Sequence, residues 1–329
     1  MSAFLQFSHT GKPLEVLELG TRELPPLKHR EVRVAMRYAP INPADLNFIE
    51  GNYGRQPVLP AIPGHEGAGQ VVAVAPDVES LAVGDLVLPL AGTGCWVEHL
   101  TAPEHEFAKL PDQIDLVQAS MLRVNPTTAW CLLHNFIDLE KGEWVAQNAA
   151  NSGVGRALIQ VAKKLGFRTL NFVRRPELID ELKALGADEV LLDSEEGVAQ
   201  ARELTKGHAP RLATNAVGGE SAIRLMDVLG HSGTLVTYGA MSRASLKVPN
   251  KFIIFKDLTL RGLWVTKWFE QASHSEMHDV MRPLAEMIQD GDLVTAIDEV
   301  VPLKDFASAI ARAQADSRTG KVILDLAST

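Results

Sequence analysis

The chain has 329 residues, of which 46% are apolar and 22% charged, ordinary values for a globular protein with room for two domains. Its net charge of −9 argues against nonspecific binding to nucleic acid, because an acidic surface repels phosphate. No apolar run reaches the roughly 18–20 residues needed to span a bilayer, so we expect no membrane partner. Two cysteines, Cys95 and Cys131, are too few for a disulfide framework. The start of the chain has neither the apolar core of a signal peptide nor the composition of a transit peptide. Together with the low cysteine count, this predicts a cytoplasmic location.

The first third of the chain is predicted to be rich in β-structure. Short apolar or alternating stretches are separated by Pro, Gly and Asp turns, which is typical of a small barrel. These stretches are residues 31–38, 67–75 and 84–90.

Near residue 120 the pattern changes to strands that alternate with helices. The predicted strands are 143–149, 168–173, 188–193, 211–217 and 233–239, and the predicted helices are 155–166, 176–186 and 219–230. Such alternation indicates a doubly wound parallel sheet. The segment LTLRGLWV (258–265) is either an edge strand that pairs across a homodimer or an internal strand.

The last part of the chain contains a polar helical stretch (275–291) and a short strand, GKVILDL (320–326). We expect this tail to rejoin the first domain. The sequence therefore predicts an α/β protein with a discontinuous catalytic domain, 1–120 and 266–329, around a cofactor domain, 121–265.

The stretch QNAANSGVGRALIQ (147–160) follows a strand and opens a helix. Backbone N–H groups at such a helix N-terminus bind pyrophosphate. The G-x-G-x-x-G pattern is degenerate, with Ala150, Ser152 and Gly155 at its three positions. By itself the motif is weak, and an arbitrary strand–turn–helix corner is the alternative.

The end of the second strand of this domain carries two arginines, Arg174 and Arg175. NAD-dependent enzymes place an acidic residue there for the ribose 2′-hydroxyl, whereas guanidinium groups pair with a 2′-phosphate. The pair favours NADPH over NADH, unless it is only a solvated pair at a helix start.

The turn GHEG (64–67) resembles the metal-binding turn of zinc dehydrogenases. A tetrahedral zinc site needs convergent thiolate, imidazole or carboxylate ligands. His65 and Glu66 are available, but Asn42 stands where those enzymes place a cysteine, and the cysteine-rich lobe for a structural zinc is missing. We therefore predict no metal site and interpret His65 as a structural residue.

Together, these segments resemble the zinc-independent medium-chain dehydrogenase/reductase superfamily, and within it the 2-enoyl thioester reductases of the mitochondrial trans-2-enoyl-CoA reductase type. The similarity covers nearly the whole chain, and its more specific motifs are GNYG, NAANSGVG, VTYGAM and FKDLTLRGLW. One departure is His65, where these reductases often have asparagine. The resemblance implies a GroES-like barrel domain, a Rossmann domain, and a role in fatty acid metabolism.

The resemblance also implies site residues. Tyr53 of GNYG matches the catalytic tyrosine of the family. The positions that match cofactor contacts or flank the nicotinamide and substrate are Asn125, Asn151, Ser152, Gly153, Val154, Arg174, Arg175, Tyr238, Gly239, Ala240, Met241, Leu263, Trp264, Val265, Thr266 and Lys321. Trp264 and Trp268 either line an acyl pocket or belong to the core.

The implied reaction is NADPH-dependent reduction of a trans-2-enoyl thioester carried by CoA or by an acyl carrier protein. A phenol with an ordinary pKa of about 10 keeps its proton at neutral pH, so a tyrosine suits either enolate stabilisation or proton donation. The alternative role for Tyr53 is packing at a domain interface. The alternative functions are an NADPH:quinone oxidoreductase and a non-catalytic relative that binds a cofactor or RNA.

Overall fold

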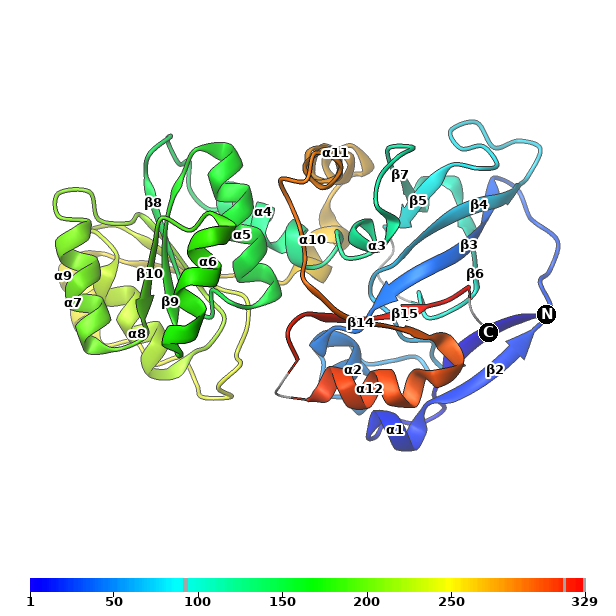
Figure 1. Cartoon of the computed structure of the whole chain (residues 1–329), viewed down its shortest axis with the longest axis horizontal. Coiled ribbons are helices and arrows are strands. Elements are labelled where there is room, and N and C mark those ends of the chain that lie inside the picture. The colour runs from blue at the N-terminus through cyan, green and yellow to red at the C-terminus, as the bar shows by residue number, and fades with distance from the viewer. Residues whose placement is uncertain (91–93, 316–317, 328–329) are drawn as a thin grey trace. The chain divides into compact units, whose positions relative to one another are not determined.

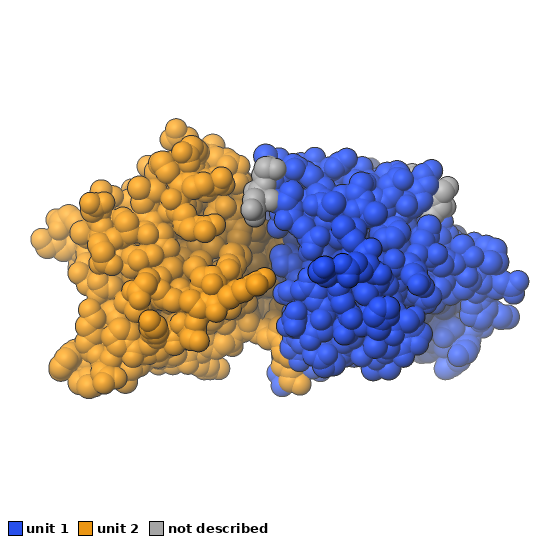
Figure 2. Space-filling view, turned by 90° about the horizontal axis from the view of Figure 1, so that it is seen from below, with its two compact units in different colours: residues 1–124, 269–329 blue, residues 125–268 orange. Residues whose placement is uncertain are grey.

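The computed structural model describes residues 1–90, 94–315 and 318–327 and divides into two compact units. The first unit comprises Met1–Val124 and Phe269–Thr329, and the second comprises Asn125–Trp268 (Figure 2). The sequence-based division placed the two boundaries at 120/121 and 265/266. Among the described residues, no helix is both long and apolar enough to cross a membrane.

The first unit is built on a mainly antiparallel sheet of seven strands (Figure 1). The order along the sheet is β14-β15-β3-β4-β5-β7, and β6 also pairs with β3. The strands are β3 (Glu31–Pro40), β4 (Ala68–Val74), β5 (Leu86–Pro89), β6 (His99–Pro103), β7 (Phe107–Lys109), β14 (Ile297–Pro302) and β15 (Lys321–Asp325). β15 lies antiparallel to β3, so the strand of the C-terminal tail belongs to the sheet of the first unit.

The remaining elements of the first unit surround this sheet. They are the hairpin of β1 (Ser2–Gln6) with β2 (Glu18–Arg22), and the helices α1 (Pro13–Val16), α2 (Pro43–Glu50), α3 (Leu116–Ala119), α11 (His274–Gln289) and α12 (Phe306–Gln314). The core includes the fully buried Trp96 and Phe7. The loop with Tyr53 follows directly after α2, whose last turn ends at Gly51 in the left-handed conformation that glycine adopts without strain.

The second unit is a doubly wound sheet of six parallel strands in the order β10-β9-β8-β11-β12-β13. The strands are β8 (Trp144–Gln147), β9 (Arg168–Val173), β10 (Glu189–Leu192), β11 (Leu212–Asn215), β12 (Thr234–Thr237) and β13 (Thr259–Gly262). In chain order this is 3-2-1-4-5-6, the Rossmann arrangement, so the predicted fold is confirmed. β13 lies at the edge of the sheet, and the alternative that it is an internal strand is wrong.

Helices lie on both faces of this parallel sheet (Figure 1). They are α4 (Asn125–His134), α5 (Gly153–Leu165), α6 (Ile179–Leu185), α7 (Glu195–Leu204), α8 (Gly219–Val228) and α9 (Asn250–Lys256), and α10 (Val265–Gln271) follows β13. The predicted helix 176–186 begins as a 3-10 turn, Pro176–Leu178, before α6. No helix was predicted over α7, because its mostly polar sequence lacks a clear apolar stripe, although Ser194 caps its N-terminus.

Candidate functional site

Tyr53 lies half-buried in the loop after α2, and its ring packs against His65. The ring centroids of Tyr53 and His65 are 5.2 Å apart, with an angle of 72° between the ring planes. His65 is 5% exposed and meets Phe48 on α2 in a similar edge-to-face contact at 5.7 Å. The sequence placed Tyr53 and GHEG in one loop region but did not predict that their rings touch.

Asp45, on α2, fixes the orientation of His65. One carboxylate oxygen of Asp45 accepts hydrogen bonds from the backbone N–H of His65 at 2.8 Å and from its Nδ1 at 2.5 Å. The other oxygen accepts from the backbone N–H of Asn42 at 2.8 Å. Because an ionised carboxylate only accepts, Nδ1 of His65 carries the hydrogen.

A buried acid, Glu66, and a buried amine, Lys321, lie next to this arrangement and are bridged by Asn42. The Asn42 side-chain amide donates to Glu66 at 2.8 Å and accepts from the ammonium of Lys321 on β15. Glu66 also accepts from the backbone N–H of Val124 at 2.7 Å. Burial raises the pKa of Glu66, and Lys321 and the two hydrogen bonds oppose this increase. Burial also lowers the pKa of Lys321, while Glu66 opposes that decrease.

Arg123 adds a second buried cation to the first unit. Its guanidinium donates to the carbonyl oxygens of Leu90 and His65 at 2.9 and 3.0 Å, and it lies over the Phe269 ring at 3.9 Å from the centroid. Burial lowers the pKa of Arg123 to about 10. The carbonyl contact holds the backbone of the GHEG turn in place.

The side-chain atoms of His65 and Glu66 named above, which could otherwise bind a metal, already have partners within the protein. Nδ1 of His65 is bound to Asp45, and Glu66 accepts from the Asn42 amide and from the backbone N–H of Val124. In the parts of the chain that the structure describes, no group of three or more His, Cys, Asp or Glu side chains is placed to hold a metal ion. The absence of a metal remains a prediction from the sequence.

The second unit positions the predicted pyrophosphate turn at the N-terminus of α5. Ser152 caps this helix by accepting a hydrogen bond from the N–H of Gly155 at 3.1 Å. A Cβ at Gly155 would lie 2.6 Å from the carbonyl oxygen of Ala150, so only glycine fits there. Gly155 thus lets the start of α5 pack closely against the backbone of Ala150. The helix presents its backbone N–H groups and the positive end of its dipole at the turn.

Four buried polar side-chain atoms in this unit have no hydrogen-bond partner among the described residues: the side-chain nitrogen of Asn125, Oε1 of Gln147, Oγ1 of Thr214 and the hydroxyl of Tyr238. Asn125 starts α4, and Tyr238 lies directly after β12. A Cβ on Gly153 would meet that Asn125 nitrogen at 2.8 Å, so the amide lies beside the turn. Buried polar groups normally have partners, and such orphans fit a site that a bound ligand completes. Burial raises the pKa of Tyr238, so its hydroxyl keeps its proton.

Sequence reasoning missed a hydrogen-bond network at the carboxyl ends of β8 and β11. The Asn148 amide donates to Asn215 and Ser221, both at 2.8 Å, and its oxygen accepts from the N–H of Ala216 at 2.8 Å. Between these two strands the winding of the sheet reverses, which is where ligands bind in doubly wound folds. The available signal was an asparagine near the carboxyl end of each of two predicted strands, 143–149 and 211–217.

The other predicted cofactor and substrate positions have varied exposure. Arg174 and Arg175 follow β9 directly and are exposed, as guanidinium groups for a phosphate should be. Met241 and Trp264 are exposed, and Thr266 is buried. The half-buried positions are Asn151, Ser152, Gly153, Val154, Gly239, Leu263 and Val265, and Ala240 is exposed. Lys321 belongs to the first unit, bound to Asn42 as described, and the roles of all these residues remain predictions.

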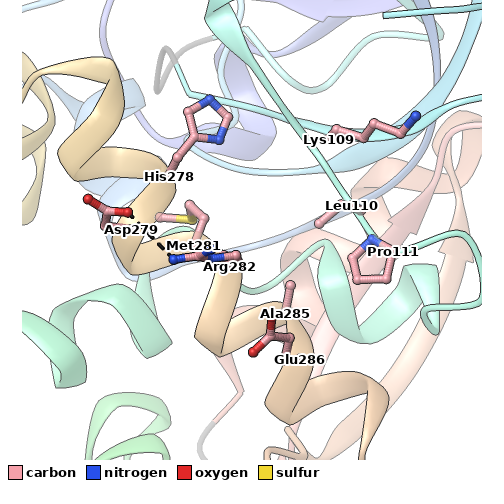
Figure 3. Close-up of a pocket in the computed structure, with 9 residues that line it drawn as sticks. All are labelled: Lys109, Leu110, Pro111, His278, Asp279, Met281, Arg282, Ala285 and Glu286. Carbon is pink, nitrogen blue, oxygen red and sulfur yellow. Dashed lines mark ion pairs between the residues drawn. The ribbon is translucent and has the colours of Figure 1, made fainter. Parts of the chain in front are cut away.

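The described residues of the first unit also enclose a cavity of about 370 Å³ between the end of β7 and one face of α11 (Figure 3). Its charged lining is largely paired: Lys109 contacts Asp85 at 2.7 Å, and Arg282 contacts Asp279 at 3.7 Å. None of the predicted site residues lines this cavity.

The residues fit a phosphorylated dinucleotide. The turn offers helix N–H groups without intruding side chains, the Asn125 amide needs an acceptor, and two exposed arginines end the neighbouring strand. Groups of these kinds bind a pyrophosphate or a 2′-phosphate in dinucleotide-binding folds.

Comparisons with known proteins agree with this geometry. Residues 28–112 match the alcohol dehydrogenase GroES-like domain, and residues 153–286 match the zinc-binding dehydrogenase family. The human mitochondrial enoyl-[acyl-carrier-protein] reductase is 42% identical over 328 residues, which cover 98% of this chain and 88% of the relative.

Solved structures give the same fold. A putative NADPH:quinone reductase from Bacillus thuringiensis superposes with a TM-score of 0.91 at 29% identity, covering 98% of both chains. The complex of Etr1p with NADP and crotonyl-CoA gives a TM-score of 0.90 at 28% identity, covering 98% of this chain and 99% of Etr1p. Etr1p is also known as part of a mitochondrial 2-enoyl thioester reductase heterodimer from Candida tropicalis. The resemblance stated from the motifs is confirmed: the chain belongs to the 2-enoyl thioester reductase family of the medium-chain dehydrogenase/reductase superfamily.

Proposed function

We propose that this protein reduces the C2=C3 double bond of trans-2-enoyl thioesters, carried by CoA or by an acyl carrier protein, with NADPH as the reductant. The observation that carries the proposal is Tyr53, a half-buried phenol packed on a fixed imidazole, in a chain that matches enoyl reductases along almost its whole length. Quinone reduction gives such a phenol no carbon to protonate.

When bound, NADPH supplies the hydride that is added to the β-carbon. The protein's own residues must then handle the charge and the proton. Negative charge develops on the thioester oxygen as the α-carbon becomes enolate-like. The Tyr53 hydroxyl either donates a hydrogen bond to that oxygen or transfers its proton to the α-carbon. Either role requires a protonated phenol held in one orientation.

The second unit provides the groups that bind the cofactor. The N–H groups at the start of α5 would hold the pyrophosphate, with Ser152 capping the helix and the unpaired Asn125 amide available as a donor. Arg174 and Arg175 bind the 2′-phosphate through charge-assisted hydrogen bonds. Replacing both arginines with alanine should weaken NADPH binding at least tenfold, an expected ~1.4 kcal/mol or more, and leave NADH binding unchanged. Equal weakening of both in fluorescence titrations would refute this role.

The main test compares NADPH oxidation with crotonyl-CoA, a longer enoyl-CoA and a quinone, for the wild type and for Tyr53→Phe. We expect turnover of both thioesters, and a loss of about 100-fold in kcat in the variant, within the range for a general acid. NADPH affinity should change little. Full thioester turnover by Tyr53→Phe would show that the phenol has no role in the reaction.

A second candidate, NADPH:quinone oxidoreductase, is favoured by the likeness to the quinone reductase structure. In that case the quinone is reduced, Tyr53→Phe keeps its activity, and crotonyl-CoA is left unreacted. If neither substrate class oxidises NADPH, the protein is instead a non-catalytic relative.

We further propose that the protein forms a homodimer through the edge strand β13. Directly before it, Ile254 and Phe255 on α9 are 67% and 76% exposed, which places apolar side chains beside an unpaired strand edge. Sedimentation of the wild type should give a dimer, and Phe255→Glu should give monomers. A monomeric wild type would refute this proposal.

The cytoplasmic location remains a proposal from the sequence, and the human relative is named as mitochondrial. Fractionation of cells that produce the protein at its natural level would test it. Recovery in an organelle fraction would overturn it.

A further inference from the structure

The contact between His65 and Tyr53 suggests a role for a residue that the sequence interpretation treated as scaffold. The imidazole lies between the rings of Phe48 and Tyr53, at centroid distances of 5.7 and 5.2 Å. Both contacts are edge-to-face, with interplanar angles of 80° and 72°. Edge-to-face pairs of aromatic rings prefer this geometry and separation. The orientation of His65 therefore limits where the Tyr53 ring can lie.

Three hydrogen bonds hold His65 in place. Asp45 binds both its backbone N–H and its Nδ1, and Arg123 binds its carbonyl oxygen. All three residues are buried. The carboxylate fixes both the tautomer and the rotation of the imidazole, as an acidic partner does in catalytic histidine pairs.

We propose that His65 is a positioning residue for Tyr53, and that the Asp45–His65 pair sets the direction in which the phenol hydroxyl points. This role rests on the proposed function, in which Tyr53 serves the thioester. His65 does not touch the reacting atoms in this account and acts only through Tyr53. A misplacement of about 1 Å in a catalytic group can cost about 100-fold in rate.

A double-mutant cycle tests this coupling with crotonyl-CoA as the substrate. His65→Asn introduces the residue that similar reductases often carry, so the variant should fold. We expect kcat to fall about tenfold, within that cost of misplacement, with KM for NADPH unchanged. In the Tyr53→Phe background the same substitution should have no further effect on the residual turnover, because the group on which it acts is gone. Losses that multiply in the double variant, or an unchanged kcat in the single one, would overturn the proposal.

A spectroscopic test does not depend on the identity of the substrate. The chain has three tyrosines, so ring-labelled tyrosine gives few NMR signals, and that of Tyr53 is identified by its loss in Tyr53→Phe. His65→Asn and Asp45→Asn should both shift the Tyr53 ring signals. His99→Asn is the control, since His99 on β6 contacts Ser2 on β1 and has no ring contact with Tyr53 among the contacts described. Unmoved Tyr53 signals in both variants would refute the positioning role. Shifted signals in a protein that turns over no enoyl thioester would support positioning and refute only the proposed function.

Discussion

The two units satisfy the polar groups of their candidate sites in opposite ways. In the first unit, the buried side chains of Asn42, Asp45 and Glu66 all find partners within that unit. In the second unit, the Asn125 amide nitrogen and the Tyr238 hydroxyl are buried without a protein partner in the described part of the chain.

The difference indicates what each unit is built to do. A buried polar group without a partner costs about 1–3 kcal/mol, which only a ligand that supplies the missing partner can recover. The second unit is thus less stable without its ligand, and binding the ligand recovers this free energy. The first unit keeps its network complete and offers one phenol, Tyr53, on a rigid support. Substitutions in the first network should therefore change stability, and those at the orphaned groups should change affinity.

The largest effect is expected for Glu66→Gln. This substitution removes the buried acid whose charge offsets that of the buried Lys321 amine, and leaving a buried charge uncompensated costs about 3–5 kcal/mol. The melting temperature of the ligand-free protein should fall by about 10 °C in calorimetry. The double variant Glu66→Gln/Lys321→Met removes both charges and should recover most of the loss. An unchanged melting temperature in the single variant would show that the pair does not stabilise the first unit.

The second comparison uses two asparagines of the second unit. Asn125→Ala removes an unpaired donor, so the ligand-free melting temperature should stay within about 2 °C while the Kd for NADPH rises about tenfold. Asn148→Ala is the matched variant, because it removes an amide whose hydrogen bonds are all internal. It should lower the melting temperature by about 6 °C. If Asn125→Ala lowers the melting temperature of the ligand-free protein as much as Asn148→Ala does, the Asn125 amide stabilises the fold and is not reserved for a ligand.

Local patterns made much of the second unit predictable from sequence. The strand, turn and helix around Ser152 are encoded within some fifteen residues, and the cap and the glycine contact are both found in the structure. The edge position of β13 was one of the two alternatives that the sequence left open, and the structure shows it. The exposed Arg174 and Arg175 follow from their place directly after a buried strand.

The network of the first unit could not be predicted in the same way. Asn42 and Lys321 are 279 residues apart, and no periodicity or spacing connects them. The pairing of Asp45 with His65 depends on how α2 packs against the GHEG turn, which is a tertiary feature. Sequence reasoning interpreted His65 through its resemblance to a metal ligand. Its actual partners are a carboxylate and two rings.

The smallest effect concerns a second glutamate of the first unit, whose pKa moves in the opposite direction to that of Glu66. Glu104 accepts hydrogen bonds from Ser80, from the backbone of Glu79 and from Arg30, and these lower its pKa to about 2. A glutamate in the unfolded chain has a pKa of about 4.3, so the Glu104 carboxylate stabilises the folded protein above that pH, and this stabilisation is lost as the pH falls toward about 2.

The melting temperature of Glu104→Gln should therefore be about 3 °C below that of the wild type at pH 7, and this gap in melting temperature should close in acid. Glu23→Gln, at an exposed site of the same unit, should show no gap at any pH. If the difference in melting temperature between Glu104→Gln and the wild type stays constant as the pH falls toward about 2, the contribution of Glu104 to stability comes from packing and not from its charge.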